Sequence, residues 1–133
     1  MFKRLTTTLL SSLLALPLAF MLSTSSASAE ASLIMAEEHG CIWCARWNSE
    51  IGPIYPKTSE GQAAPLRRIN ILEPLPEGTA LSRRVTFTPT FILTVDGIER
   101  SRIEGYPEED FFWGLLGQML KQEGIPFEVN TSE

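Results

Sequence analysis

"EHGCIWCARW", residues Glu38 to Trp47, contains both cysteines and the single histidine of this 133-residue chain. Covalent haem attachment requires C-x-x-C-H, and residue 45 is alanine, so a haem site is excluded. A structural zinc site needs four ligands, whereas Cys41, Cys44 and His39 supply three and would need a glutamate as well. A passive disulfide of this spacing closes a very small loop and stabilises a fold little. Zinc, copper(I) on two thiolates, a passive disulfide and a redox centre remain open.

The position of the cysteines relative to a predicted helix favours the redox interpretation. Ser32–Ala36 is a short apolar run typical of a buried strand, and a helix is expected over Trp43–Ile51. Cys41 then lies where free backbone N–H groups and the helix dipole stabilise a thiolate. We therefore expect Cys41 to be the exposed nucleophile. Cys44, one turn later, would lie beneath it and resolve the mixed disulfide.

Neighbours of the cysteines are candidates for binding substrate or tuning reactivity. Trp43 is a candidate substrate contact, and its backbone N–H is expected to donate to the Cys41 sulfur. His39 either adds positive charge and shuttles protons or is simply an exposed loop residue. Arg46 either favours the thiolate or is an exposed helix charge. Trp47 is predicted to pack in the core.

A second signal lies about 45 residues downstream, in Phe87–Phe91, which reads FTPTF. Pro89 stands at the start of an apolar strand, where it cannot donate to a sheet ladder. A cis Thr88–Pro89 bond would let this segment approach the cysteines. It would also present the backbone of Thr88 to an extended substrate, so Thr88 and Pro89 are candidate substrate-binding residues.

Apolar spacing and turn residues predict the remaining elements. A strand is expected over Arg68–Leu72, a short helix over Thr79–Arg84, two strands over Thr90–Val95 and Ile98–Glu104 joined by a hairpin at Asp96-Gly97, and a final helix from Pro107 to about Gly124. The segment before Pro65 is expected to be a polar loop. A βαβ unit followed by ββα predicts an α/β fold, a mixed four-stranded sheet flanked by helices on both faces.

These motifs together resemble the thioredoxin superfamily over nearly the whole of the chain after residue 30. The resemblance implies a thioredoxin-like fold, a cis proline at Pro89 and thiol–disulfide exchange at Cys41 and Cys44, with no cofactor. Three features depart from the family. Ile42-Trp43 replaces the usual Gly-Pro, Met35 stands where a buried acid is usual, and the first strand and helix are missing. Glu37 or Glu38 is a candidate substitute for that acid.

More narrowly, the chain resembles the periplasmic SoxS-type thioredoxins of bacterial sulfur-oxidation clusters. The run from Cys41 to Ile71, the FTPTF segment and RIEGYPEEDFFWGLL carry this resemblance. It implies an enzyme that reduces disulfides or mixed disulfides of a protein partner, here a SoxYZ-like sulfur carrier, and that is itself reduced by a membrane thiol–disulfide electron donor. The alternatives are an oxidant or isomerase that folds exported proteins, or a non-enzymatic copper- or zinc-binding module with the same fold.

The first 29 residues have the pattern of a secretory signal peptide: Lys3 and Arg4, a short apolar stretch and Ala27-Ser28-Ala29. An uncleaved membrane anchor is the alternative. Cleavage near Ala29–Glu30 would release a single domain, residues 30–133, into the periplasm without stable membrane insertion. All 16 acidic residues lie in that domain with nine of the 11 basic residues, so its net charge is −7. This excess of negative charge argues against a nucleic-acid partner.

Overall fold

The computed structural model describes residues 28–128. The predicted signal peptide, residues 1–29, lies outside the described residues except for its last two positions. Within residues 28–128, no helix has both the length and the apolar character needed to cross a membrane.

Four strands form one sheet in the order β2-β1-β3-β4. Their bounds are Ala31–Glu37 for β1, Leu66–Asn70 for β2, Thr90–Val95 for β3 and Ile98–Glu104 for β4. Strand β1 pairs in parallel with β2 and antiparallel with β3, and β3 pairs antiparallel with β4. The predicted mixed four-stranded sheet is confirmed. Strand β2 lies two residues closer to the N-terminus than expected.

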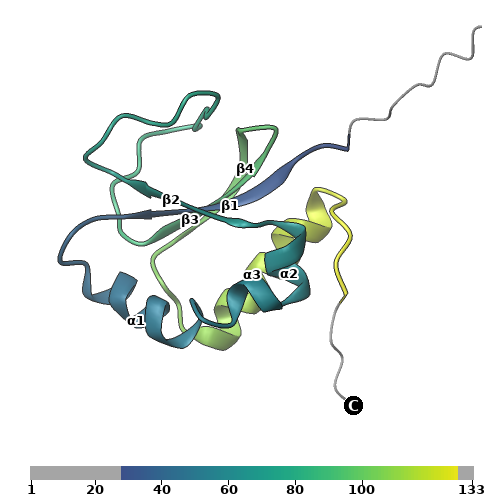
Figure 1. The fold of residues 1–133 in the computed structure, drawn as a ribbon, viewed down its shortest axis with the longest axis horizontal. Coiled ribbons are helices and arrows are strands. Elements are labelled where there is room, and N and C mark those ends of the chain that lie inside the picture. The colour runs from purple at the N-terminus through teal and green to yellow at the C-terminus, as the bar shows by residue number, and fades with distance from the viewer. Residues whose placement is uncertain (1–27, 129–133) are drawn as a thin grey trace, which may run out of the picture.

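The helices lie along one face of the sheet, and the prediction of helices on both faces is wrong. Their bounds are Ile42–Glu50 for α1, Tyr55–Lys57 for the 3-10 helix η1, Ser59–Ala63 for α2 and Glu109–Gln122 for α3. Figure 1 shows α1, α2 and α3 together below the sheet, with the segment between β2 and β3 above it. Helix α2 lies where a polar loop was expected, and Thr58 caps it by accepting the N–H of Gly61.

Each central strand buries side chains on both faces, in alternation. Leu33 and Met35 of β1 face the helices, whereas Ile34 and Ala36 face the other side. On that second side the cover comes from Ile71, Leu81 and Val85 in the segment between β2 and β3. A strand buried on both faces is often covered by helices, but its apolar run reports only that each face is covered. This is why the sequence misled the prediction.

The predicted helix Thr79–Arg84 is also wrong, because Ala80 pairs with the outer edge of the sheet instead. The N–H of Ala80 donates to the carbonyl of Gly97 at 2.9 Å, and its carbonyl accepts the N–H of Glu99 at 2.9 Å. These bonds use the groups that a helix would need. The hairpin at Asp96-Gly97 is confirmed, with φ angles of 53° and 78°, as its tight turn requires.

Aromatic rings fill the space between the sheet and the helices. Trp47 of α1 is fully buried and packs on Phe91 and Phe112, with ring centroids 5.2 and 5.7 Å away. Tyr55 extends this group and donates its hydroxyl proton to the carbonyl of Ala64 at 2.7 Å. The predicted packing role of Trp47 is confirmed. Because Trp47 lies one turn after Cys44 on the same side of α1, this cluster fixes where the cysteines sit.

Two adjacent phenylalanines in α3 allow the contribution of this aromatic core to the free energy of unfolding to be measured. We expect Phe112→Ala to lower the free energy of unfolding by about 3–5 kcal/mol, because Phe112 is fully buried and its removal leaves a cavity. Phe111→Ala is the matched control, since Phe111 is 68% exposed and its loss should change stability by less than about 0.5 kcal/mol. Urea denaturation followed by tryptophan fluorescence measures both. Equal effects would contradict this packing.

Candidate active site

The cysteines form a disulfide at the start of α1. The Sγ atoms of Cys41 and Cys44 are 2.04 Å apart. Cys41 is the N-cap residue of the helix, and its Sγ accepts the N–H of Cys44 at 3.1 Å. The donor to the Cys41 sulfur is therefore the N–H of Cys44, and the expectation that Trp43 would supply it is wrong. Residue N3 of a helix is where an N-cap side chain usually finds its donor.

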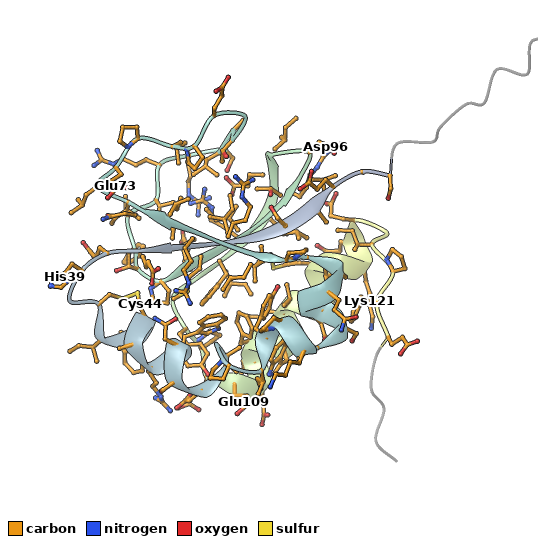
Figure 2. All side chains as sticks on the ribbon, in the orientation of Figure 1. His39, Cys44, Glu73, Asp96, Glu109 and Lys121 are labelled. Carbon is orange, nitrogen blue, oxygen red and sulfur yellow. A yellow bond between two sulfur atoms is a disulfide. The ribbon has the colours of Figure 1, made fainter. Side chains whose placement is uncertain are left out.

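The two sulfurs differ in their access to solvent. Cys41 is half-buried, whereas Cys44 is 3% exposed and belongs to the core cluster. Figure 2 shows Cys44 on the side of α1 that faces the sheet. An incoming group therefore reaches Cys41 first, and Cys44 is available only from within the protein. This is the arrangement expected from the helical spacing of the pair.

The Thr88–Pro89 peptide bond is cis, as expected. The backbone on either side of Thr88 is held internally: the Thr90 hydroxyl donates to the Phe87 carbonyl at 2.7 Å, and the Gly105 N–H donates to the Pro89 carbonyl at 2.7 Å. Neither the N–H nor the C=O of Thr88 has a hydrogen-bond partner among residues 28–128. These two groups are therefore free to bond an extended chain.

The segment at Thr88 is joined to the segment before Cys41 by one side-chain contact. The hydroxyl of Thr88 donates to Oε1 of Glu38 at 2.8 Å. Sequence reasoning considered Glu38 only as a substitute for a buried acid and missed this contact. No local pattern could have revealed it, because the two residues are 50 positions apart.

Exposed apolar side chains lie next to both segments in the sequence. Ile42 and Trp43 follow Cys41 and are 80% and 52% exposed, and Phe87 precedes Thr88 and is 62% exposed. We call these three residues the apolar rim. Single exposed apolar residues are common, but two that directly follow the reactive Cys41 and one that directly precedes Thr88 are suited to contact a protein chain. Phe87 was not predicted as a contact, although it begins the FTPTF segment.

Arg46 is held over Trp43 by carboxylates. Its guanidinium carbon lies 5.6 Å from the Trp43 ring centroid, within the range of a cation–π contact. Its Nε lies 2.9 Å from Oε1 of Glu50, and a terminal nitrogen lies 3.7 Å from Glu108. The hydroxyl of Tyr106 donates to the other oxygen of Glu50 at 2.7 Å. Hydrogen bonds from Arg46 and then Tyr106 lower the pKa of Glu50, although solvent weakens this exposed group of contacts.

The remaining predicted residues are not gathered at the disulfide. His39 is exposed, and Figure 2 shows it at the outer end of the loop after β1, directed away from the body of the protein. Met35 is fully buried, and Arg68 reaches its sulfur at 3.4 Å. Arg68 also forms an ion pair with Glu37 at 3.0 Å. Of the two candidate substitutes for a buried acid, Glu37 is thus engaged by Arg68 and Glu38 by Thr88.

Within residues 28–128, no three His, Cys, Asp or Glu side chains are grouped as ligands of one metal ion would be.

No protein-family model and no curated protein matches the chain. A solved structure does: the periplasmic thioredoxin SoxS from Paracoccus pantotrophus, in its reduced form. The two chains are 52% identical and superpose with a TM-score of 0.70, over 71% of this chain and 99% of the other. The chain belongs to the thioredoxin family. Its fold is that of a thioredoxin, and its Cys41–Cys44 pair is the redox-active centre of a thiol–disulfide oxidoreductase.

In this thioredoxin, Tyr106 provides a measurable test of the contacts around Arg46. Tyr106→Phe removes a hydrogen bond to the charged form of Glu50, so we expect the pKa of Glu50 to rise. The stabilisation that comes from its lowered pKa is present above the unfolded-state pKa and is lost as the pH falls through the folded-state value. An NMR titration of the Glu50 carboxyl carbon measures this shift.

Tyr55→Phe is the matched control for that titration. The Tyr55 hydroxyl donates to the carbonyl of Ala64 and not to Glu50, so this variant should leave the Glu50 pKa where it is in the wild type. An unchanged Glu50 pKa in Tyr106→Phe would show that the hydrogen bond does not form in solution.

Proposed function

We propose that this thioredoxin reduces disulfides or mixed disulfides of an exported protein partner in the periplasm. The observation that carries the proposal is the disulfide at the start of α1, where Cys41 is accessible and Cys44 is buried. The unpaired backbone groups of Thr88 and the apolar rim support a protein chain as the substrate. The similarity to a periplasmic thioredoxin supports the compartment.

The proposed reaction has two exchanges. In the reduced protein, the Cys41 thiolate attacks one sulfur of the substrate disulfide, forms a mixed disulfide and releases the other substrate sulfur as a thiolate. The Cys44 thiolate then attacks the Cys41 sulfur and releases the second substrate thiolate. Two electrons pass to the substrate, and Cys41–Cys44 is left as the disulfide seen in this structure. A membrane thiol–disulfide electron donor must supply two electrons to reset it.

Backbone groups at the start of α1 would stabilise the Cys41 thiolate. The N–H of Cys44 points at the Cys41 sulfur, and a helix N-terminus favours a negative charge. His39 and Arg46 are proposed to modulate this reactivity. Because Glu50 and Glu108 offset the charge of Arg46, we propose that Arg46 acts mainly by holding Trp43 against the substrate.

The proposed partner is a SoxYZ-like sulfur-carrier protein. The similarity to a SoxS thioredoxin at 52% identity supports this choice. A folding oxidant or isomerase of exported proteins is the second candidate, because the Ile42-Trp43 pair replaces the Gly-Pro of ordinary thioredoxins between the cysteines and does not by itself set the direction of exchange. That pair is one of the features on which the reduction potential of such centres depends.

Reduction of insulin tests the chemistry. We expect the domain, residues 30–133, to accelerate the precipitation of insulin by dithiothreitol, and Cys41→Ser to abolish the acceleration because no nucleophile remains. Cys44→Ser, reduced and then freed of dithiothreitol before insulin is added, should accumulate a mixed disulfide with Cys41 that is visible by mass spectrometry, because the resolving thiol is absent. Full activity in Cys41→Ser would contradict the assigned roles.

Trapping in a native host identifies the partner. Cys44→Ala leaves Cys41 able to attack but removes the resolving thiol, so substrates should remain covalently attached. We expect a sulfur-carrier protein to be enriched among the trapped chains, relative to a Cys41→Ala/Cys44→Ala control. A broad set of exported proteins with multiple disulfides would instead favour the folding oxidant or isomerase.

A further inference from the structure

We propose that Glu38 is a positioning residue that holds the substrate-binding segment at Thr88 in register with Cys41. The contact between the Thr88 hydroxyl and Oε1 of Glu38, 2.8 Å long, carries the inference. It rests on the proposed function, because it concerns how a protein disulfide is aligned for attack by Cys41.

Glu38 contacts both halves of the site. Its backbone carbonyl accepts the N–H of Cys41 at 3.4 Å, in the turn that leads into α1. Its carboxylate accepts the hydroxyl of Thr88 at 2.8 Å. A single residue therefore links the nucleophile to the segment beside the substrate, across 50 positions of sequence.

Hydrogen bonds hold the residues on either side of Thr88, and the contact with Glu38 is the one that holds Thr88 itself. Phe87 and Pro89 use their carbonyls to accept from Thr90 and Gly105. Thr86 and Phe87 are exposed, and Glu38 is the hydrogen-bond partner of the Thr88 side chain. The peptide groups that are free to bond a substrate are those of Thr88, and the contact with Glu38 adds a side-chain anchor at that residue to the backbone anchors on either side. Fixing such groups before binding lowers the entropic cost of binding an extended chain.

The neighbouring carboxylate, that of Glu37, does not contact Thr88. Glu37 is held by Arg68, which also bonds Asn48 at 2.8 Å. Its side chain thus faces strand β2, while that of Glu38 faces the Thr88 segment. The two glutamates carry the same charge one residue apart in the sequence and differ in what they contact, which makes Glu37 a matched control.

The experiment compares a disulfide that lies along Thr88 with one too small to do so. The variants reduce a disulfide-bonded peptide and, separately, bis(2-hydroxyethyl) disulfide, which is uncharged; excess dithiothreitol supplies the two electrons that restore the Cys41/Cys44 dithiol, and its direct reaction with each disulfide is subtracted. We expect Glu38→Ala to raise the KM for the peptide about five-fold, the size expected for loss of one hydrogen bond, with kcat within two-fold of wild type. The second-order rate with the small disulfide should stay within two-fold.

Three further variants separate positioning from other effects. Thr88→Val removes the donor and should raise the peptide KM as much as Glu38→Ala, and the double variant should show no further increase. Glu38→Gln keeps an acceptor without the charge and should restore the KM to within two-fold. Glu37→Ala should leave it unchanged. Thermal unfolding of each variant verifies that it is folded before its kinetics are compared.

The outcomes are distinct. An unchanged peptide KM in both Glu38→Ala and Thr88→Val would overturn the positioning role while leaving the oxidoreductase intact. Equal losses with the peptide and the small disulfide would also overturn it, because the effect would then lie in Cys41 itself. A wild-type protein inactive towards both disulfides would overturn the proposed function, and the role of Glu38 with it.

Discussion

Burial of Trp47 between the sheet and α3 is the interaction on which the position of the active site depends. A helix of nine residues is too short to be stable alone, so α1 takes its place from packing. Trp47 supplies that packing through Phe91 on the sheet and Phe112 on α3. Cys44 is buried on the same side one turn earlier, and the disulfide is therefore fixed relative to β3 and the cis proline that precedes it.

Because the helices lie on one side of the sheet, its two faces are covered in different ways. On the helical face, large aromatic rings fill the core, and α1 packs on them through Cys44 and Trp47. On the opposite face, Leu81 and Val85 cover Ile34 and Ile92 from a segment without a helix. That same segment continues directly to Thr88. The proposed substrate-binding groups of Thr88 thus lie at the end of a long connection without a helix. A side-chain contact such as that with Glu38 can therefore stabilise the position of this segment.

The sequence predicted the elements whose signals are periodic or local. The β-rich, uncharged run Thr90–Val95, the Asp96-Gly97 turn and the apolar stripe of α3 each correspond to a local backbone preference, and all three are found. The cysteine spacing likewise placed one thiol outside and one inside. Together these signals predicted a mixed four-stranded sheet and which of the two cysteine sulfurs is accessible.

What could not be predicted depends on contacts between distant parts of the chain. Helix α2 has five residues and no apolar period, so its cap at Thr58 had no pattern to support it. Ala80 pairs with the sheet edge although its neighbours favoured a helix, because tertiary hydrogen bonds outweigh weak local propensity. The contact of Glu38 with Thr88, and the carboxylates that surround Arg46, likewise require the folded chain.

The pairing of Ala80 has a consequence for solubility. A sheet with exposed edges offers unpaired backbone groups to a second molecule and can grow by strand addition. Here the β4 edge is blocked at Ile98 by the backbone of Ala80, and a side chain on Gly97 would approach within 2.0 Å of the Gly78 carbonyl oxygen, so the blocking segment fits closely. The opposite edge, β2, carries the exposed Arg67, and charged side chains on an edge strand disfavour pairing with a second copy. Each border of the sheet thus carries a feature that disfavours strand addition.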